Sequence, residues 1–396
     1  MTPAPPPGAL APDRRLLDEV IDLRRQFHRH PEVGFEEHAT SRAVEEALRD
    51  ADVAVLPRPT ETGAVGLLET GRPGRTVMLR ADIDGLPIVE ESGLDFASAT
   101  EGRMHACGHD AHTAILLGVA RNLASHAEAL TGRYLFVFQP AEEIVSGAAA
   151  MIGSGLLDRQ PADVAIGLHV WSSFKSGTVV TRPGILWSGS DAFEISFRGP
   201  GGHGGVMRRQ GNVIAAQAFL LERLHTVTEG LEFDGAGCHC SVGNVVSDGA
   251  WNIVPRSVRM KGSVRTFTSD LRAEALDRLR GLLLETDTEF DISTDFRLVH
   301  GTVPTANDAG VTSVVLDTAR ELIGDDASLL GRPLTVSDDM AEFLTRIPGC
   351  YFMLGAQPPD TEVGPAHHSP TFRIDEEAFA TGVRVLTAAA ARLAAE

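Results

Sequence analysis

Short, continuous apolar runs alternate with amphipathic stretches over the first half of the chain. The runs at 76–82 (TVMLRAD), 134–140 (YLFVFQP) and 164–170 (VAIGLHV) have the length of strands that are buried on both faces. Helical patterns separate these runs, and another such run follows at 349–356 (GCYFMLGA). This alternation predicts an α/β fold around a mainly parallel sheet.

A different pattern interrupts the alternation from about residue 188 to residue 300. Period-2 strands and amphipathic helices follow one another there in the order β-α-β-β-α-β, which is typical of a ferredoxin-like unit. We therefore expect a discontinuous α/β domain over 1–187 and 301–396, and an inserted α+β lid domain over 188–300. The length of 396 residues also favours about two domains.

Composition narrows the class of partner and the compartment. The formal net charge of −19 argues against nucleic acid and anionic membranes as partners, because both require a basic surface. The apolar runs fall short of the ~18 residues that a membrane-spanning helix needs, and no signal peptide is visible. Because 4 cysteines in so long a chain do not suggest a disulfide framework, we expect a cytoplasmic protein.

Polar side chains follow the carboxyl ends of the predicted strands, where open α/β sheets bind their ligands. In chain order they are Asp82, Asp84, Glu142, Glu143, His169, His367 and His368, and the loop HACGHD (105–110) adds Cys107 and His109. Asp110 is the expected N-cap of the helix that follows this loop. Since these residues come from five distant points of the chain, we expect a thiolate, imidazoles and carboxylates to meet at one rim.

Such a set of side chains suits zinc, manganese, cobalt or another first-row divalent ion, and two ions if one ligand bridges them. Each residue also has a simpler explanation. A Cys-x-His pair is often a buried thiol beside a polar cap, adjacent glutamates are usually solvated, and a histidine on an apolar strand usually belongs to the core. A nucleophilic Cys107 is a further alternative. The convergence of all these residues favours the metal site.

A series of segments, in order along the chain, resembles the M20 metallopeptidase family. They are LRADIDGLP, HACGHDAHTA, FQPAEE, GLHVW, GPGGHGG, WNIVP, GSVRTF, SDDMAEF and HHSPTF, and the likeness extends from about residue 26 to residue 379. Within the family, the chain is most similar to the amidohydrolase branch of hippurate hydrolases, aminoacylase-like enzymes and hydrolases of auxin–amino acid conjugates.

The resemblance implies a site for two divalent ions (manganese, zinc, cobalt or nickel). The implied ligands are Cys107, His109, Glu143, His169 and His368, with Cys107 as a bridge. Glu142 would be the general base, and Asp84 would orient a ligand. The lid domain would form a homodimer and bring His203 of GPGGHGG toward the partner's active site, where it would donate to the oxyanion. Asn252 of WNIVP would lie near the substrate.

The implied activity is that of a metal-dependent amidohydrolase, of carboxypeptidase or aminoacylase type, that cleaves N-acyl amino acids or related small conjugates. Small dipeptides and N-acetyl diaminoacids are alternative substrates for the same site. A non-catalytic protein that binds such a conjugate is a third hypothesis, although it should lack a ligand or the base, and none is lost. The segment VMRRQGN departs from the branch, and Arg208 and Arg209 could reach an anionic substrate or be solvated.

Overall fold

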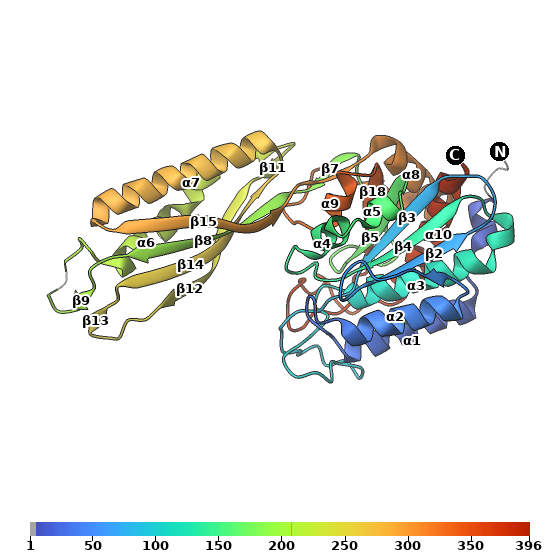
Figure 1. Ribbon diagram of the computed structural model, residues 1–396, viewed down its shortest axis with the longest axis horizontal. Coiled ribbons are helices and arrows are strands. Elements are labelled where there is room, and N and C mark those ends of the chain that lie inside the picture. Colours follow the sequence, from blue (N-terminus) through green and yellow to red (C-terminus); the bar gives the residue numbers. More distant parts are fainter. Residues whose placement is uncertain (1–4, 207) are drawn as a thin grey trace. The chain divides into compact units, whose positions relative to one another are not determined.

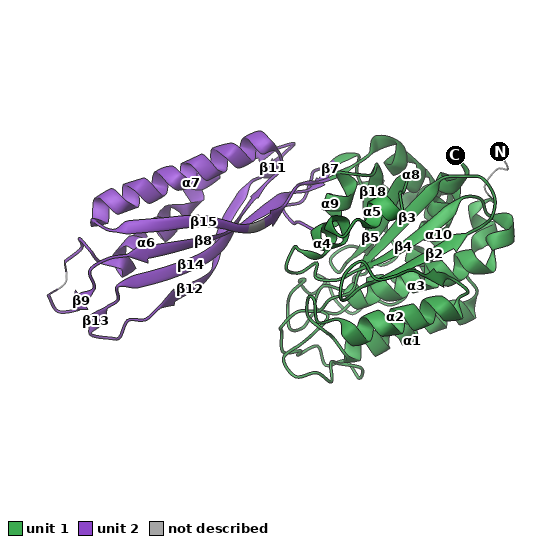
Figure 2. Cartoon of the chain, viewed as in Figure 1, with its two compact units in different colours: residues 1–184, 306–331, 339–396 green, residues 185–305, 332–338 purple. Residues whose placement is uncertain are grey.

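The computed structural model describes residues 5–206 and 208–396, which form two compact units (Figures 1 and 2). Unit 1 consists of Met1–Gly184, Ala306–Gly331 and Asp339–Glu396, and unit 2 consists of Ile185–Thr305 and Arg332–Asp338. The chain passes between the units in β7 (Gly184–Trp187) and β16 (Thr305–Asn307), and again on either side of the short segment Arg332–Asp338. The catalytic and lid roles that the sequence assigns to the two parts remain predictions.

Unit 1 is built around one large sheet with helices on its faces. Its strands are β1 (Ala54–Val55), β2 (Ala64–Glu69), β3 (Thr76–Asp82), β4 (Arg133–Gln139), β5 (Val164–Trp171), β6 (Val179–Thr181), β17 (Ala327–Leu329) and β18 (Gly349–Gly355). Its helices are α1 (Arg14–Arg29), α2 (His38–Asp50), α3 (His109–Ser125), α4 (Gly147–Gly153), α5 (Leu156–Arg159), α8 (Ala309–Ile323), α9 (Met340–Leu344) and α10 (Ala378–Ala395).

The strand order of this sheet is β1-β2-β4-β3-β5-β18-β6-β17. The four central strands, β4, β3, β5 and β18, are parallel to one another. All four have the bounds expected from the apolar runs to within a residue. The predicted α/β fold with a mainly parallel sheet is therefore confirmed.

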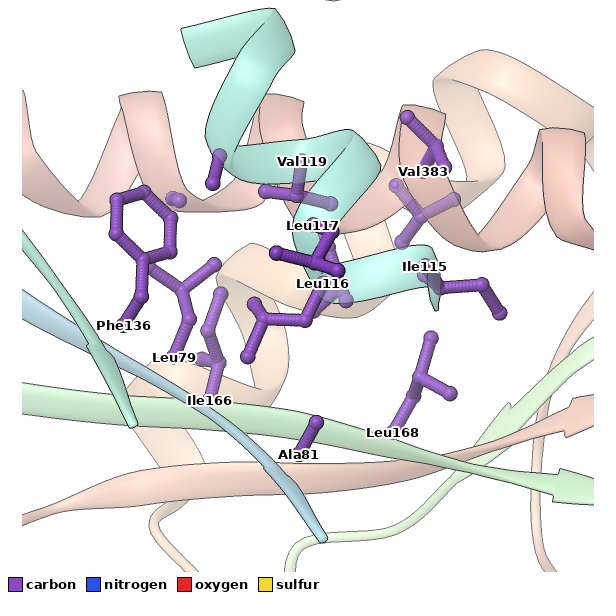
Figure 3. Packing of buried hydrophobic residues seen from close by; sticks show 14 of the residues in the cluster. Leu79, Ala81, Ile115, Leu116, Leu117, Val119, Phe136, Ile166, Leu168 and Val383 are labelled. Atoms are coloured by element: carbon purple, nitrogen blue, oxygen red, sulfur yellow. The ribbon is translucent and has the colours of Figure 1, made fainter. Parts of the chain in front are cut away.

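Both faces of the sheet are covered, because β3 and β18 are buried at every position. In β3, Leu79 lies opposite Phe136 on one side and Ile166 on the other. Figure 3 shows these three side chains pointing toward Leu116 of α3, while α10 closes the same layer. This layer fixes the start of α3 against the carboxyl ends of the strands.

Helix α10 is long and apolar enough to span a membrane by length and composition, the one such helix among the described residues. However, 72% of its apolar window is buried inside the protein. Burial of this kind is expected of a core helix, whose apolar surface packs on all sides.

Unit 2 is built around a four-stranded antiparallel sheet, against which two helices pack. Its elements are β8 (Gly189–Arg198), β9 (Gly202–His203), α6 (Val213–Arg223), β10 (Glu232–Phe233), β11 (Ala236–Gly237), β12 (His239–Ser247), β13 (Ile253–Val254), β14 (Ser257–Thr266), α7 (Ser269–Phe290) and β15 (Ser293–Thr302). The sheet has the order β12-β14-β8-β15. The main elements follow the predicted β-α-β-β-α-β order. The N-cap of α7 is Thr268, whose side chain accepts from the Leu271 amide.

The layer between α3 and the sheet is expected to dominate the stability of unit 1. Leu116→Ala should lower the free energy of unfolding by about 2–5 kcal/mol, because the side chain is 1% exposed and its loss leaves a cavity. The matched control is Leu329→Ala, which removes the same atoms from a side chain that is 54% exposed and should cost well under 1 kcal/mol. Urea unfolding of both variants checks this, and equal midpoints would contradict it.

Candidate metal centre

Five segments of unit 1 deliver polar side chains to the carboxyl ends of the central strands. The strand β3 ends at Asp82, β4 leads into Glu142 and Glu143, and His169 lies near the end of β5. The other two segments are the start of α3 and the loop after β18. The convergence predicted from the sequence is therefore present in the structure, and all these residues belong to one compact unit.

Gly108, between Cys107 and His109, makes the turn that lets both side chains face the centre. Its backbone is left-handed, with φ of 90°, and a Cβ atom at this position would lie 2.3 Å from Cγ2 of Val170. Only glycine meets both conditions without strain. The turn at Gly108 places the cysteine before the helix and the histidine on its first residue, so that both side chains reach the same centre.

The expectation for Asp110 was wrong. The N-cap of α3 is Gly108, and Asp110 is already the second residue of the helix, without a capping hydrogen bond. Its buried carboxylate instead lies 2.8 Å from Arg24 Nε and 2.7 Å from His28 Nδ1, both on α1. Because three charged or polar groups satisfy one another there, Asp110 ties α1 to the start of α3.

Two groups of possible metal ligands share the Cys107 sulfur. One group is Cys107, His109 and His169, and the other is Cys107, Glu143 and His368; within each group the ligand atoms lie within 4.8 Å of one another. The Sγ atom is 3.5 Å from His169 Nε2, and His368 Nε2 is 3.3 Å from Glu143 Oε2. These are the five ligands that the resemblance implies, with the sulfur at the position of the expected bridge.

The hydrogen bonds of two histidines direct their lone pairs into this centre. His169 Nδ1 lies 2.7 Å from the Val170 carbonyl oxygen, which can only accept, so the proton is on Nδ1. His109 Nδ1 lies 3.2 Å from Asp84 Oδ1, which fixes the same tautomer. In both rings Nε2 is then available to a metal ion, as is usual when an outer residue orients a ligand.

Two buried atoms of the centre have no hydrogen-bond partner within the described residues, namely His109 Nε2 and Glu143 Oε1. They lie 3.8 Å apart. A buried polar atom without a partner is costly, and a cation bound in each ligand group would satisfy the one of these atoms that belongs to that group. The residues present therefore fit divalent metal ions.

The electrostatics of the centre favour positive charge. Burial raises the pKa of Glu143 to about 8, and it raises the pKa of the Cys107 thiol well above its usual range, to which Glu143 contributes. Burial alone would lower the pKa of His109, but Asp82 and Cys107 raise it. A bound divalent ion would satisfy the same negative field and ionise the thiol and the carboxyl.

Glu142 is buried next to the ligand groups, with Oε2 4.0 Å from His109 Nε2. Together with His109 and Glu143, Glu142 forms a further group of side chains that could hold a metal ion. The structure thus places two adjacent carboxylates at the centre. The general-base role of one and the ligand role of the other rest on the resemblance.

His203 and Asn252, the two residues expected to act from the lid domain, are neighbours within unit 2. The strand β9 pairs with β13 so that His203 lies opposite Ile253, and the Gly204 amide donates to the Asn252 carbonyl at 2.9 Å. His203 is exposed, and its Nδ1 accepts from the Gly205 amide.

Arg209 pairs with Glu289 of the same unit at 3.0 Å, which fits the solvated alternative for this residue.

Sequence reasoning gave no role to three residues that support the centre. His112 Nδ1 is 2.5 Å from Asp82 Oδ1, and Nδ1 of the half-buried His367 lies 3.8 Å from the Cys107 sulfur. Glu37 accepts from the Ala141 amide, just before the two glutamates. The spacing of His109 and His112, three residues apart on one helix face, could have identified His112. No local pattern points to Glu37.

Comparison with known proteins identifies the family. The model of peptidase family M20/M25/M40 matches residues 78–392. The chain belongs to this family. It is 32% identical to the N-acetyl-L-cysteine deacetylase of Bacillus subtilis (strain 168), over 96% of this chain and 89% of that protein. It is 36% identical to the N-acyl-L-amino acid amidohydrolase of Geobacillus stearothermophilus, over 74% of this chain and 80% of that protein.

A solved structure agrees with this assignment. The Bacillus subtilis YXEP protein, described as a dinuclear metal-binding peptidase of the M20 family, superimposes with a TM-score of 0.79 at 27% identity. The match covers 96% of this chain and 99% of that one. The predicted family and the predicted class of enzyme, a hydrolase of the M20 type, are therefore confirmed.

The shared position of Cys107 predicts an unequal loss of metal from two variants of this M20 hydrolase. Cys107→Ala should weaken the binding of both ions by more than about 100-fold, because its sulfur belongs to both ligand groups, whereas His169→Ala should weaken mainly one. Elemental analysis after dialysis against manganese or zinc measures the difference. Cys350→Ala, a buried cysteine outside both groups, serves as the control. Equal metal contents in the Cys107 and His169 variants would contradict the shared ligand.

Proposed function

We propose that the chain hydrolyses the amide bond of N-acyl amino acids and related small conjugates, with two divalent ions in the candidate centre. One observation carries this proposal: two groups of possible ligands share Cys107, and the carboxylate of Glu142 lies beside them. The names of the two curated relatives above support the substrate class. The alternative of a non-catalytic binding protein is disfavoured, because no expected ligand and no expected base is missing.

The residues divide the chemistry between binding and proton transfer. When bound, the ions would polarise the scissile carbonyl and acidify a water molecule. Cys107, His109, Glu143, His169 and His368 would hold them. Glu142 would take the proton of the attacking water and then donate it to the nitrogen of the leaving amine. Burial of Glu142 excludes bulk water from this transfer.

We also propose that the enzyme is a homodimer that forms through unit 2. The strand β12 lies at one edge of the sheet in unit 2, and Val245 and Val246 on it are 44% and 48% exposed. An exposed apolar edge strand can pair with a second copy of itself. In such a dimer His203 would donate to the oxyanion in the partner's active site, as the resemblance implies.

A cytoplasmic location stays part of the proposal. Its support is that all four cysteines are buried and none is paired in a disulfide. Free thiols persist in a reducing compartment.

Hydrolysis is expected to depend on metal and on Glu142. A panel of N-acyl amino acids, dipeptides and N-acetyl diaminoacids should show turnover that a chelator abolishes and manganese, zinc, cobalt or nickel restores. Glu142→Gln should lower kcat by about 10²- to 10⁴-fold, because the amide cannot accept the proton of water. The exposed Glu46→Gln is the matched control. Turnover that survives complete removal of metal, or full activity of Glu142→Gln, would disprove the mechanism.

Light scattering tests the dimer. The wild-type protein should have twice the mass of one chain, and the double variant Val245→Lys, Val246→Lys should have the mass of one, because two added charges on each edge would repel. Leu329→Lys is the control, since it adds a charge to the edge strand β17 of the other sheet. A monomeric wild-type protein would refute the proposed assembly.

A further inference from the structure

The segment 31–37 (PEVGFEE), between α1 and α2, contacts two of the loops that carry the candidate centre. The Glu32 carbonyl accepts from the Gly85 amide at 2.7 Å, and Val33 forms a parallel bridge with Gly85. The Glu32 carboxylate in turn accepts from the amide of Thr40 in the first turn of α2. The segment is thereby fixed between the start of α2 and the loop that holds Asp84.

Glu37 extends the contact to the loop after β4. Its side chain is fully buried, and Oε1 accepts from the Ala141 amide at 2.7 Å. Gly34 packs against the same residue, because a Cβ atom on Gly34 would lie 3.1 Å from both Cα and Cβ of Ala141. Two residues of the segment therefore define the position of Ala141.

Ala141 occupies an unfavourable backbone conformation. Its φ is 55°, in the left-handed region that residues other than glycine rarely adopt. Such a residue persists only where its surroundings hold it. The amide on the far side of Glu142, that of Glu143, donates to Asp84 Oδ2 at 3.0 Å. Glu142 thus lies between two residues whose amides are each held by a buried carboxylate.

We propose that Glu37 is a positioning residue for Glu142: its hydrogen bond to Ala141 holds the left-handed turn that aims the Glu142 carboxylate at the attacking water. The inference rests on the proposed function, in which Glu142 is the general base. The oxygen of a general base must lie about 3 Å from the water oxygen whose proton it takes. A small shift of the base's backbone therefore lowers the rate.

The glutamine variant should preserve the function of Glu37. Burial raises the pKa of Glu37 to about 7, and nearby Asp84 contributes. The Ala141 amide needs only an acceptor oxygen, which a carboxylate, a neutral carboxyl group and a carboxamide all provide. Glu37→Ala, by contrast, leaves the amide without this acceptor.

The experiment compares Glu37→Ala and Glu37→Gln in the metal-loaded, full-length enzyme. Glu37→Ala should lower kcat about 10- to 100-fold with KM and metal content unchanged, and Glu37→Gln should restore most of the rate. Hydrogen exchange of the amides in 141–146 should be faster in Glu37→Ala and close to wild type in Glu37→Gln. The neighbouring Glu36→Ala, which removes an exposed partner of Arg103, should change neither rate nor exchange.

A second variant tests the same loop if Glu37→Ala does not fold. Gly34→Ala should push Ala141 through the added Cβ atom and lower kcat without loss of metal. Its control is Gly153→Ala, where an added Cβ meets nothing within 4 Å.

Three outcomes would overturn the inference. They are an unchanged kcat in Glu37→Ala and Gly34→Ala, a loss of rate that follows loss of metal, and a glutamine variant as slow as the alanine variant. The proposed function fails separately, if the wild-type enzyme lacks metal-dependent turnover or Glu142→Gln remains active. Active wild-type enzyme with an inactive Glu142→Gln variant and a fast Glu37→Ala variant would therefore reject the positioning role alone.

Discussion

The structure of unit 1 depends on one constraint. Imidazoles and carboxylates lie close together around the buried thiol of Cys107. Groups of this kind are costly inside a protein unless charge and hydrogen bonds compensate them. Burial raises the pKa of Glu143 to about 8, because the charged carboxylate loses its contact with water. The left-handed turn at Gly108 and the oriented ring of His109 bring such groups together, and a pair of cations would make their proximity favourable.

A second buried network holds the strands that converge on this centre. Arg80 of β3 donates to Gln139 at the end of β4 and pairs with Asp339 at 3.0 Å. Asp339 is where the chain re-enters unit 1, and its other carboxylate oxygen accepts from the Ala148 amide at 3.0 Å. The two strands and the start of α4 are therefore fixed by one guanidinium group and one carboxylate. The arrangement makes the position of Glu142 depend on residues far from it in the chain.

The fold and the convergence of the candidate ligand residues could be predicted, because each leaves a local pattern in the sequence. A strand buried on both faces must be a continuous apolar run, as TVMLRAD is, and its carboxyl end must reach the ligand rim. The supporting residues leave no such sign. Glu37 looks like any glutamate between two helices, and its importance comes from the strained backbone of Ala141, about 100 residues later. Asp110 was misread because its N-cap role fitted the local pattern, whereas the long-range contact with Arg24 decides its orientation.

The two candidate ligand groups differ in charge compensation from a third cluster of possible ligands beside them. Asp82, His109 and His112 also lie close enough together to hold a cation. However, His112 has both ring nitrogens engaged, by Asp82 Oδ1 and by the Val170 amide, and Arg80 pairs with Asp82 Oδ2 at 2.7 Å. Burial alone would raise the pKa of Asp82, but His109, His112 and Arg80 hold it well below its usual range. The negative charge of Asp82 is therefore compensated by the protein itself, whereas His109 Nε2 and Glu143 Oε1 have no hydrogen-bond partner among the described residues. Asp82 accordingly orients His112 and supports the centre from outside, and the proposed cations would lie on the side of Cys107.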